Sequence, residues 1–179
     1  MTSIPLAPLP DDVARRVAEL GAKQVNLYHA LAHAPDLLRA TMAFAWGVRD
    51  HDATPRRLRE LIILRTAVLH QAPYEWHQHR RMAREAGVTE TEVAELQMWR
   101  TSGGFTPAER AALALTDAIV AGEVPAEVNE EIDRHFDHAQ RVELTLTAAF
   151  YTMVPRVLDA LGVPIEEDDQ AAEAGSHSG

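Results

Sequence analysis

The chain of 179 residues has an ordinary globular composition, 46% hydrophobic and 25% charged, and is long enough for one domain with a full hydrophobic core. Its formal net charge of -10, without a block of Lys and Arg, argues against nucleic acid or an anionic membrane as a partner. The absence of cysteine excludes disulfides, thiolate metal ligands and thiol catalysis.

Both ends of the chain differ in composition from its middle. Residues 1–10 carry three prolines and are predicted to form an extended arm, whereas residues 165–179 are acidic and are predicted to be a disordered tail. The N-terminus lacks the basic and apolar regions of a signal peptide, and no run of about 18 apolar residues occurs. We therefore expect a cytoplasmic protein without a membrane span, with its domain at residues 11–164.

Helical periodicity dominates from residue 11 to residue 161, and no segment shows the alternation of a strand. After N-terminal helices up to residue 50, the pattern predicts helices at 55–71, 73–86, 90–101, 107–120, 125–138 and 139–161. Thr54 is predicted to cap the first of these, with Pro55 at its first helical position. Thr89 with Glu92, and Thr106 with Glu109, are predicted capping boxes. The fold class is therefore all-α, with about eight helices.

The helix predicted at 55–71 has an apolar stripe so wide that it must be largely buried, and it carries Glu60. Pro73 breaks this helix and opens the next one, so that the chain can reverse. Glu75 and His79 lie four residues apart on the second helix and therefore share a face. An adjacent carboxylate would hold the imidazole, and crowded carboxyl groups have raised pKa values. The three residues predict a proton-transfer site, although the same spacing also suits surface pairs of Glu75 with His79 and of Glu60 with Arg56.

Three segments resemble the carboxymuconolactone decarboxylase family, which also contains the alkylhydroperoxidase-D (AhpD) peroxidases. They are RELIILR at 59–65, YEWHQH at 74–79 and AREAGV at 83–88, and the resemblance extends over residues 25–163. It implies an AhpD-like helical bundle that assembles as a homo-oligomer, a trimer or a hexamer, with its sites near subunit contacts.

The two branches of this family differ at two positions. The cysteines of the peroxidase branch fall on Ala72 and Glu75, so a thiol-peroxidase mechanism is closed to this chain. The decarboxylase branch has the spacing Glu-x14-Glu-x3-His, which Glu60, Glu75 and His79 match. The resemblance implies that these three residues form an acid/base site that works without a cofactor on a small molecule.

Other residues are candidates with lesser support. Tyr74 and Trp76 flank the site and Tyr151 lies on the last helix, so all three are predicted to contact the substrate. His77, about 200° around the helix from His79, is predicted to face solvent. Two carboxylates and a histidine also suit zinc or iron, but no second copy of the motif is present and no metal is predicted.

The sequence thus favours a cofactor-free acid/base lyase, a decarboxylase or isomerase, for a small lactone or carbonyl compound. In this hypothesis His79 moves the proton, Glu75 orients His79, and Glu60 is the second acid or base. Two alternatives stay open. One is a peroxidase-like or metal-dependent redox protein, which the lack of cysteine disfavours, and the other is a ligand-binding member of the family without catalysis.

Overall fold

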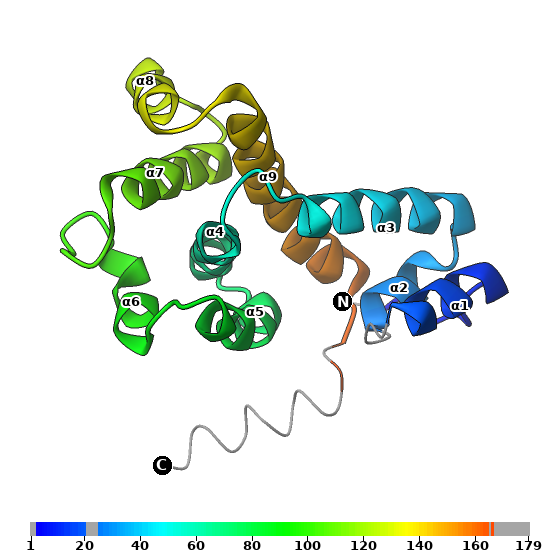
Figure 1. The fold of residues 1–179 in the computed structure, drawn as a ribbon. Coiled ribbons are helices and arrows are strands. Elements are labelled where there is room, and N and C mark those ends of the chain that lie inside the picture. The colour runs from blue at the N-terminus through cyan, green and yellow to red at the C-terminus, as the bar shows by residue number, and fades with distance from the viewer. Residues whose placement is uncertain (1–2, 21–24, 165, 167–179) are drawn as a thin grey trace, which may run out of the picture. The chain divides into compact units, whose positions relative to one another are not determined.

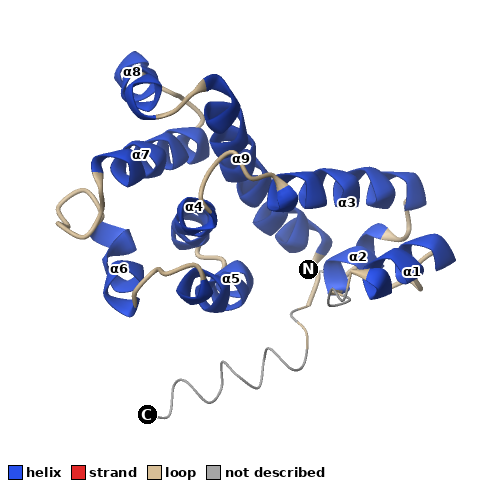
Figure 2. Ribbon diagram, in the orientation of Figure 1, coloured by secondary structure: helices blue, strands red, loops and turns tan. Residues whose placement is uncertain are grey.

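A computed structural model describes residues 3–20, 25–164 and 166, and every regular element in these ranges is a helix (Figures 1 and 2). The all-α class is thereby confirmed. The elements are α1 (Asp11–Glu19), α2 (Asn26–Leu31), α3 (Pro35–Asp50), α4 (Arg56–His70), α5 (Pro73–Glu85), α6 (Glu90–Glu95), the 3-10 helix η1 (Leu96–Met98), α7 (Pro107–Ala121), α8 (Ala126–His135) and α9 (His138–Leu161).

The described residues form two compact units. One contains the residues up to Gly47 together with those from Arg156 onwards, and the other contains Val48–Pro155. Every predicted catalytic and substrate-binding residue belongs to the second unit. Within the described ranges, no helix has the length and apolar character that a bilayer span requires.

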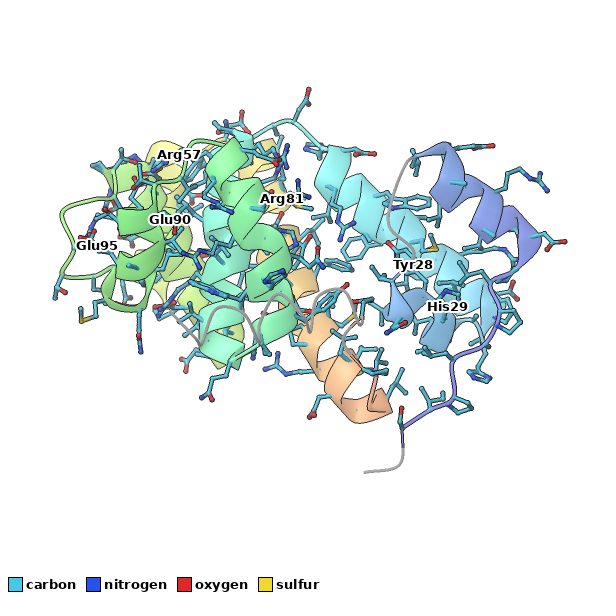
Figure 3. The ribbon with its side chains drawn as sticks, turned by 90° about the horizontal axis from the view of Figure 1, so that it is seen from below. Tyr28, His29, Arg57, Arg81, Glu90 and Glu95 are labelled. Atoms are coloured by element: carbon cyan, nitrogen blue, oxygen red, sulfur yellow. The ribbon has the colours of Figure 1, made fainter. Side chains whose placement is uncertain are left out.

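In the first unit, two histidines anchor the N-terminal arm. The ring of His29, labelled in Figure 3, bonds the carbonyl oxygen of Ala7 at 2.8 Å, and His33 Nε2 bonds that of Pro5 at 2.7 Å. The i,i+4 spacing of these histidines therefore has a structural role. Of the predicted tail, the structure describes only Glu166, whose Oε1 accepts a hydrogen bond from the Asn26 N–H at 2.7 Å; the rest of the predicted tail lies outside the described residues.

Helix α4 forms the centre of the second unit, where it packs against both α5 and α7 (Figure 1). Its apolar side chains are distributed between two core clusters. Leu61 and Leu64 pack with residues of α5, α6 and α7, and Leu58 and Ile62 pack with residues of α7, α8 and α9. The wide apolar stripe predicted from the sequence is thus buried on both sides, which places Glu60, Arg65 and Thr66 of α4 inside the protein as well.

Local signals fix the beginnings of the helices around this core. Both predicted capping boxes are confirmed, Thr89 with Glu92 at α6 and Thr106 with Glu109 at α7. Arg57, labelled in Figure 3, joins the two boxes by ion pairs to both glutamates. These contacts attach α4 to the starts of α6 and α7.

The predicted cap of α4 is wrong. The helix begins at Arg56, with Pro55 in the cap position and no side-chain cap. The hydroxyl of Thr54 is buried without a hydrogen-bond partner, while its backbone N–H donates to Glu143 Oε2 at 2.9 Å. A distant carboxylate on α9 therefore holds this segment, and local spacing does not reveal such a contact.

Thr106→Ala is expected to destabilise the protein by about 0.5–2 kcal/mol, because it removes the side-chain acceptor for the Glu109 N–H. The free energy of unfolding from urea titrations measures this loss. Thr91→Ala is the matched control, since Thr91 is exposed within α6, and it is expected to leave stability unchanged or slightly raised. Equal losses in the two variants would contradict a capping role for Thr106.

Candidate functional site

The turn between α4 and α5 determines which side chains meet in the second unit. Helix α4 ends at Gln71, which adopts the left-handed conformation with φ 50°. The Ala72 N–H returns to the carbonyl oxygen of Ala67 at 2.9 Å, and Pro73 opens α5. The chain reverses here, as the sequence predicts, so that Glu60 on α4 reaches the face of α5 that carries His79.

Glu60 and His79 form a buried hydrogen-bonded pair. His79 Nδ1 lies 2.9 Å from Glu60 Oε2, and the exposed fractions of the two residues are 6% and 5%. An ionised carboxylate accepts the Nδ1 proton, which leaves Nε2 of the neutral ring as a proton acceptor. This is the arrangement in which a carboxylate fixes the tautomer of a histidine base.

The charge of His79 reflects competing effects. Burial lowers the pKa of the His79 imidazole, while the hydrogen bond and the charge of Glu60 raise it. The positive charges of Arg49 and Arg56 add to the lowering of this pKa. The net direction is downward, so His79 is neutral at pH 7 and able to accept a proton.

Glu75 lies on the buried face of α5 with His79 but forms no ion pair with the described residues. Its exposed fraction is 4%, and its Oε1 is buried without a hydrogen-bond partner. Burial raises the pKa of this carboxyl from 4.5 to about 7. The prediction that Glu75 orients the imidazole is wrong, because Glu60 takes that position. Glu75 instead has the properties of a proton donor near neutral pH.

Tyr151 on α9 packs against this pair. Its ring meets the His79 imidazole edge-to-face with centroids 4.9 Å apart, and Arg49 Nε donates to its hydroxyl oxygen at 3.3 Å. Arg56 Nε lies 3.5 Å from Glu60 Oε1 in a long, partly exposed contact. Two guanidinium groups therefore border the buried pair, one through Tyr151 and one through Glu60.

The sequence did not single out Arg49. It lies at the end of α3, and its partner Tyr151 is 102 residues further along the chain, so no local spacing connects them. A basic residue in the last turn of a helix also has an ordinary role opposite the helix dipole. Arg56 was visible from the sequence only as a surface partner of Glu60.

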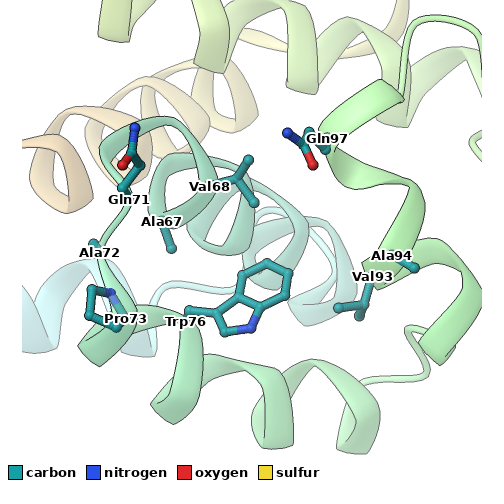
Figure 4. Close-up of a pocket in the computed structure, with 9 residues that line it drawn as sticks. All are labelled: Ala67, Val68, Gln71, Ala72, Pro73, Trp76, Val93, Ala94 and Gln97. Carbon is teal, nitrogen blue, oxygen red and sulfur yellow. The ribbon is translucent and has the colours of Figure 1, made fainter. Parts of the chain in front are cut away.

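The remaining predicted residues are distributed around α5. Tyr74 and His77 are both half-buried, so His77 faces solvent only in part. Trp76 lines a cavity of about 460 Å³ formed by the end of α4, the start of α5, and α6 with η1 (Figure 4). Glu60, Glu75 and His79 are not among the residues that line this cavity. Trp76 therefore lines this cavity, whereas Tyr151 contacts His79.

The described part of the chain contains no group of three or more His, Asp or Glu side chains arranged to hold a metal ion. Glu60, Glu75 and His79 therefore do not form such a group among the described residues.

Comparison with known proteins relates the segment that contains α4 and α5 to one family. Residues 35–118, which include α4 and α5, match the carboxymuconolactone decarboxylase family. The chain is also 30% identical to the uncharacterized protein YdfG of Bacillus subtilis (strain 168) over 110 residues, which is 60% of this chain and 75% of YdfG. The chain belongs to the carboxymuconolactone decarboxylase family, as the sequence motifs predict.

Solved structures share the fold at low sequence identity. A peroxidase-related protein from Ralstonia eutropha JMP134 with an AhpD core superposes with a TM-score of 0.77 at 22% identity, over 94% of this chain and 96% of that one. A Cys-to-Ala variant of the debrominase Bmp8, in complex with 2,3,4-tribromopyrrole, has a TM-score of 0.77 at 21% identity, over 98% of both chains. The fold is therefore AhpD-like.

Replacement of Glu75 tests the electrostatics of the site. The folded-state pKa of about 7 lies above the ordinary value of 4.5, so burial favours the protonated carboxyl. The stability that this group contributes is complete below pH 4.5 and is lost as pH rises through 7. Relative to Glu75→Gln, the wild type should therefore lose stability on the order of 3 kcal/mol between pH 4.5 and pH 8, at about 1.36 kcal/mol for each pKa unit.

Urea unfolding of both proteins across this pH range measures the difference. Glu123→Gln is the control, because Glu123 is exposed. The pH profile of the stability of this variant should follow that of the wild type. Parallel pH profiles for the wild type and Glu75→Gln would contradict a buried carboxyl with a raised pKa.

Proposed function

We propose that the protein is a cofactor-free acid/base enzyme, a decarboxylase or isomerase, that acts on a small lactone or carbonyl compound. The observation that carries this proposal is the buried Glu60–His79 hydrogen bond together with a second buried carboxyl, Glu75, that lacks a hydrogen-bond partner at Oε1. A neutral histidine and a carboxyl group with a pKa near 7 supply a base and an acid at the same pH.

The roles follow from the protonation states. Glu60 fixes the Nδ1–H tautomer, so that His79 Nε2 removes a proton next to a carbonyl and the electron pair of the C–H bond enters the enolate. Protonated Glu75 delivers its proton to carbon, which completes an isomerisation. In a decarboxylation, the electrons of the C–C bond remain on the substrate as CO2 leaves, and one proton from Glu75 replaces the lost carboxylate. After an isomerisation, the proton that His79 took returns to Glu75 by way of water. After a decarboxylation, His79 takes a proton from water and passes it to Glu75, so that His79 is needed in both reactions.

The charges around the site favour an anionic substrate. The chain has a formal net charge of -10, but Arg49 and Arg56 place two positive charges beside the buried pair. More than half of the Arg56 side chain is exposed, and its contact with Glu60 is made through Nε. Its terminal amino groups suit a substrate carboxylate, which a guanidinium binds in bidentate fashion.

The absence of thiols argues against a peroxidase function. The positions that correspond to the peroxidase cysteines hold Ala72 and Glu75, and neither side chain has redox chemistry. Bmp8, whose substituted residue is a cysteine, belongs to this fold as well, so the same scaffold carries different chemistry. Assembly into a homo-oligomer, a trimer or hexamer, is part of the proposal, and sedimentation velocity tests it.

His79→Ala is expected to lower kcat by about 10²–10⁴-fold, because it removes the general base. The assay follows γ-carboxymuconolactone by ultraviolet absorbance and CO2 release, and then a panel of related lactones and carbonyl acids. His77→Ala, two residues away on the same helix, should retain turnover. Turnover by His79→Ala at the wild-type rate would refute the assignment, and no turnover of any compound by the wild type would favour a ligand-binding role.

Arg56→Gln is expected to raise KM for an anionic substrate by about 10-fold or more, because hydrogen bonds between charged groups contribute about 1.5–3 kcal/mol. KM for the corresponding methyl ester should change little. Arg81→Gln is the control, since Arg81 is an exposed arginine of α5 that pairs with Glu85. If Arg56→Gln raised KM equally for acid and ester, Arg56 would not be recognising the carboxylate.

A further inference from the structure

The cavity beside Trp76 is a second feature of the same unit, and the acid/base mechanism does not use it. Four elements border it, namely the last turn of α4, the first turn of α5, α6 and the adjoining η1. Its volume of about 460 Å³ is within the range of small-molecule sites, roughly 300–1,000 Å³. The cavity is therefore large enough for one compact ligand.

The lining determines what kind of molecule fits. Most of it is apolar, including Val68, Ala72, Ala94 and the indole of Trp76, and none of the described residues that line it is charged. A charged ligand would find no counter-ion among these residues. Figure 4 shows the Trp76 ring lying across the cavity, where it offers a flat surface for stacking. The lining thus favours a neutral, planar molecule.

Two amide side chains supply the polar contacts. Gln71 and Gln97 come from different elements and lie at separate points of the lining (Figure 4). An amide both donates and accepts hydrogen bonds, so two of them match a ligand group that also does both. Primary carboxamides, lactams and the amide edges of heteroaromatic rings are such groups.

Gln71 also has an unusual backbone conformation. Its φ of 50° is the sole positive φ among the described residues other than glycine. Glycine adopts this conformation without the steric cost that a Cβ atom causes, which is why it commonly follows the last turn of a helix. Gln71 lines the cavity and carries a steric cost that glycine at the same position would avoid.

We propose that this cavity is a binding site for a neutral, planar molecule that carries an amide or lactam group, and that it is distinct from the Glu60–His79 site. The two sites differ in chemistry, since arginines border one and uncharged side chains line the other. They share the start of α5, where Ala72 and Pro73 line the cavity and Glu75 follows two residues later. The inference does not depend on catalysis, because its test measures binding alone.

Benzamide is the probe, because it combines an aromatic ring with one primary amide. Indole N–H signals in ¹H–¹⁵N NMR spectra report on Trp46, Trp76 and Trp99 separately, and Trp76→Phe identifies the signal of Trp76. Benzamide should shift this signal in a saturable manner, whereas benzoate and benzylammonium, its charged counterparts, should not. Saturable binding of benzoate as strong as that of benzamide would overturn the predicted neutrality of the ligand.

Substitutions of residues that line the cavity test whether benzamide binds there. Gln71→Gly removes one amide and relieves the backbone, so the fold should persist while benzamide affinity falls about 3–10-fold, the effect of one hydrogen bond. Ala94→Phe fills the cavity from an exposed position of α6 and should abolish binding, whereas Ala149→Phe, at an exposed alanine of α9, should not. Unchanged affinity in both Gln71→Gly and Ala94→Phe would overturn the site.

Two further outcomes distinguish this cavity from the acid/base site and from a subunit interface. His79→Ala should bind benzamide as the wild type does, and loss of binding in that variant would place the probe at the acid/base site instead. If a second copy of the chain covers the cavity, benzamide will not bind to the wild type and Ala94→Phe will shift the sedimentation coefficient towards that of the monomer. That result would overturn the small-molecule site in favour of a subunit interface.

Discussion

The burial of α4 on both sides is the constraint on which the rest of the second unit depends. A helix that packs against α5 on one face and α7 on the other has no solvent-facing side for a carboxylate in its middle turns. Glu60 must then be paired inside the protein, where His79 on α5 is a closer partner than Arg56. Since unpaired buried charges are costly, the position of this pair follows from the packing of the helix that carries it.

The same burial generates the proposed chemistry. Glu75 is held in a place that disfavours its charged form, and this raises its pKa to about 7. The raised pKa of Glu75 therefore has two consequences. It lowers stability above neutral pH, and it leaves the carboxyl with a proton to donate near neutral pH. His79 avoids the corresponding penalty by staying neutral beside Glu60. The proposed acid and base therefore depend on two carboxyl groups with different surroundings. Glu75 Oε1 is buried without a hydrogen-bond partner, whereas Glu60 is hydrogen-bonded to the neutral His79.

The sequence predicted the features that short-range chemistry determines. The capping boxes, the break at Pro73 and the shared face of Glu75 and His79 depend on residues three to five positions apart, and all of them appear in the structure. Contacts that depend on how helices pack could not be predicted in this way. The choice of Glu60 as the partner of His79 depends on the approach of α4 to α5, and the contact of Arg49 with Tyr151 joins α3 to α9.

The first turn of α5 explains how one scaffold separates two environments. Ala72 and Glu75 stand where the resemblance to the peroxidase branch assigns two cysteines, which would have to react with each other. In this chain Ala72 lines the apolar cavity, and Glu75 lies outside that lining, on the buried helix face that carries His79. Replacing a reactive pair with a small apolar residue and a carboxyl group removes the link between the two positions. In the two proposed functions, Ala72 lines a site that binds an uncharged molecule, and Glu75 belongs to a site that moves a proton.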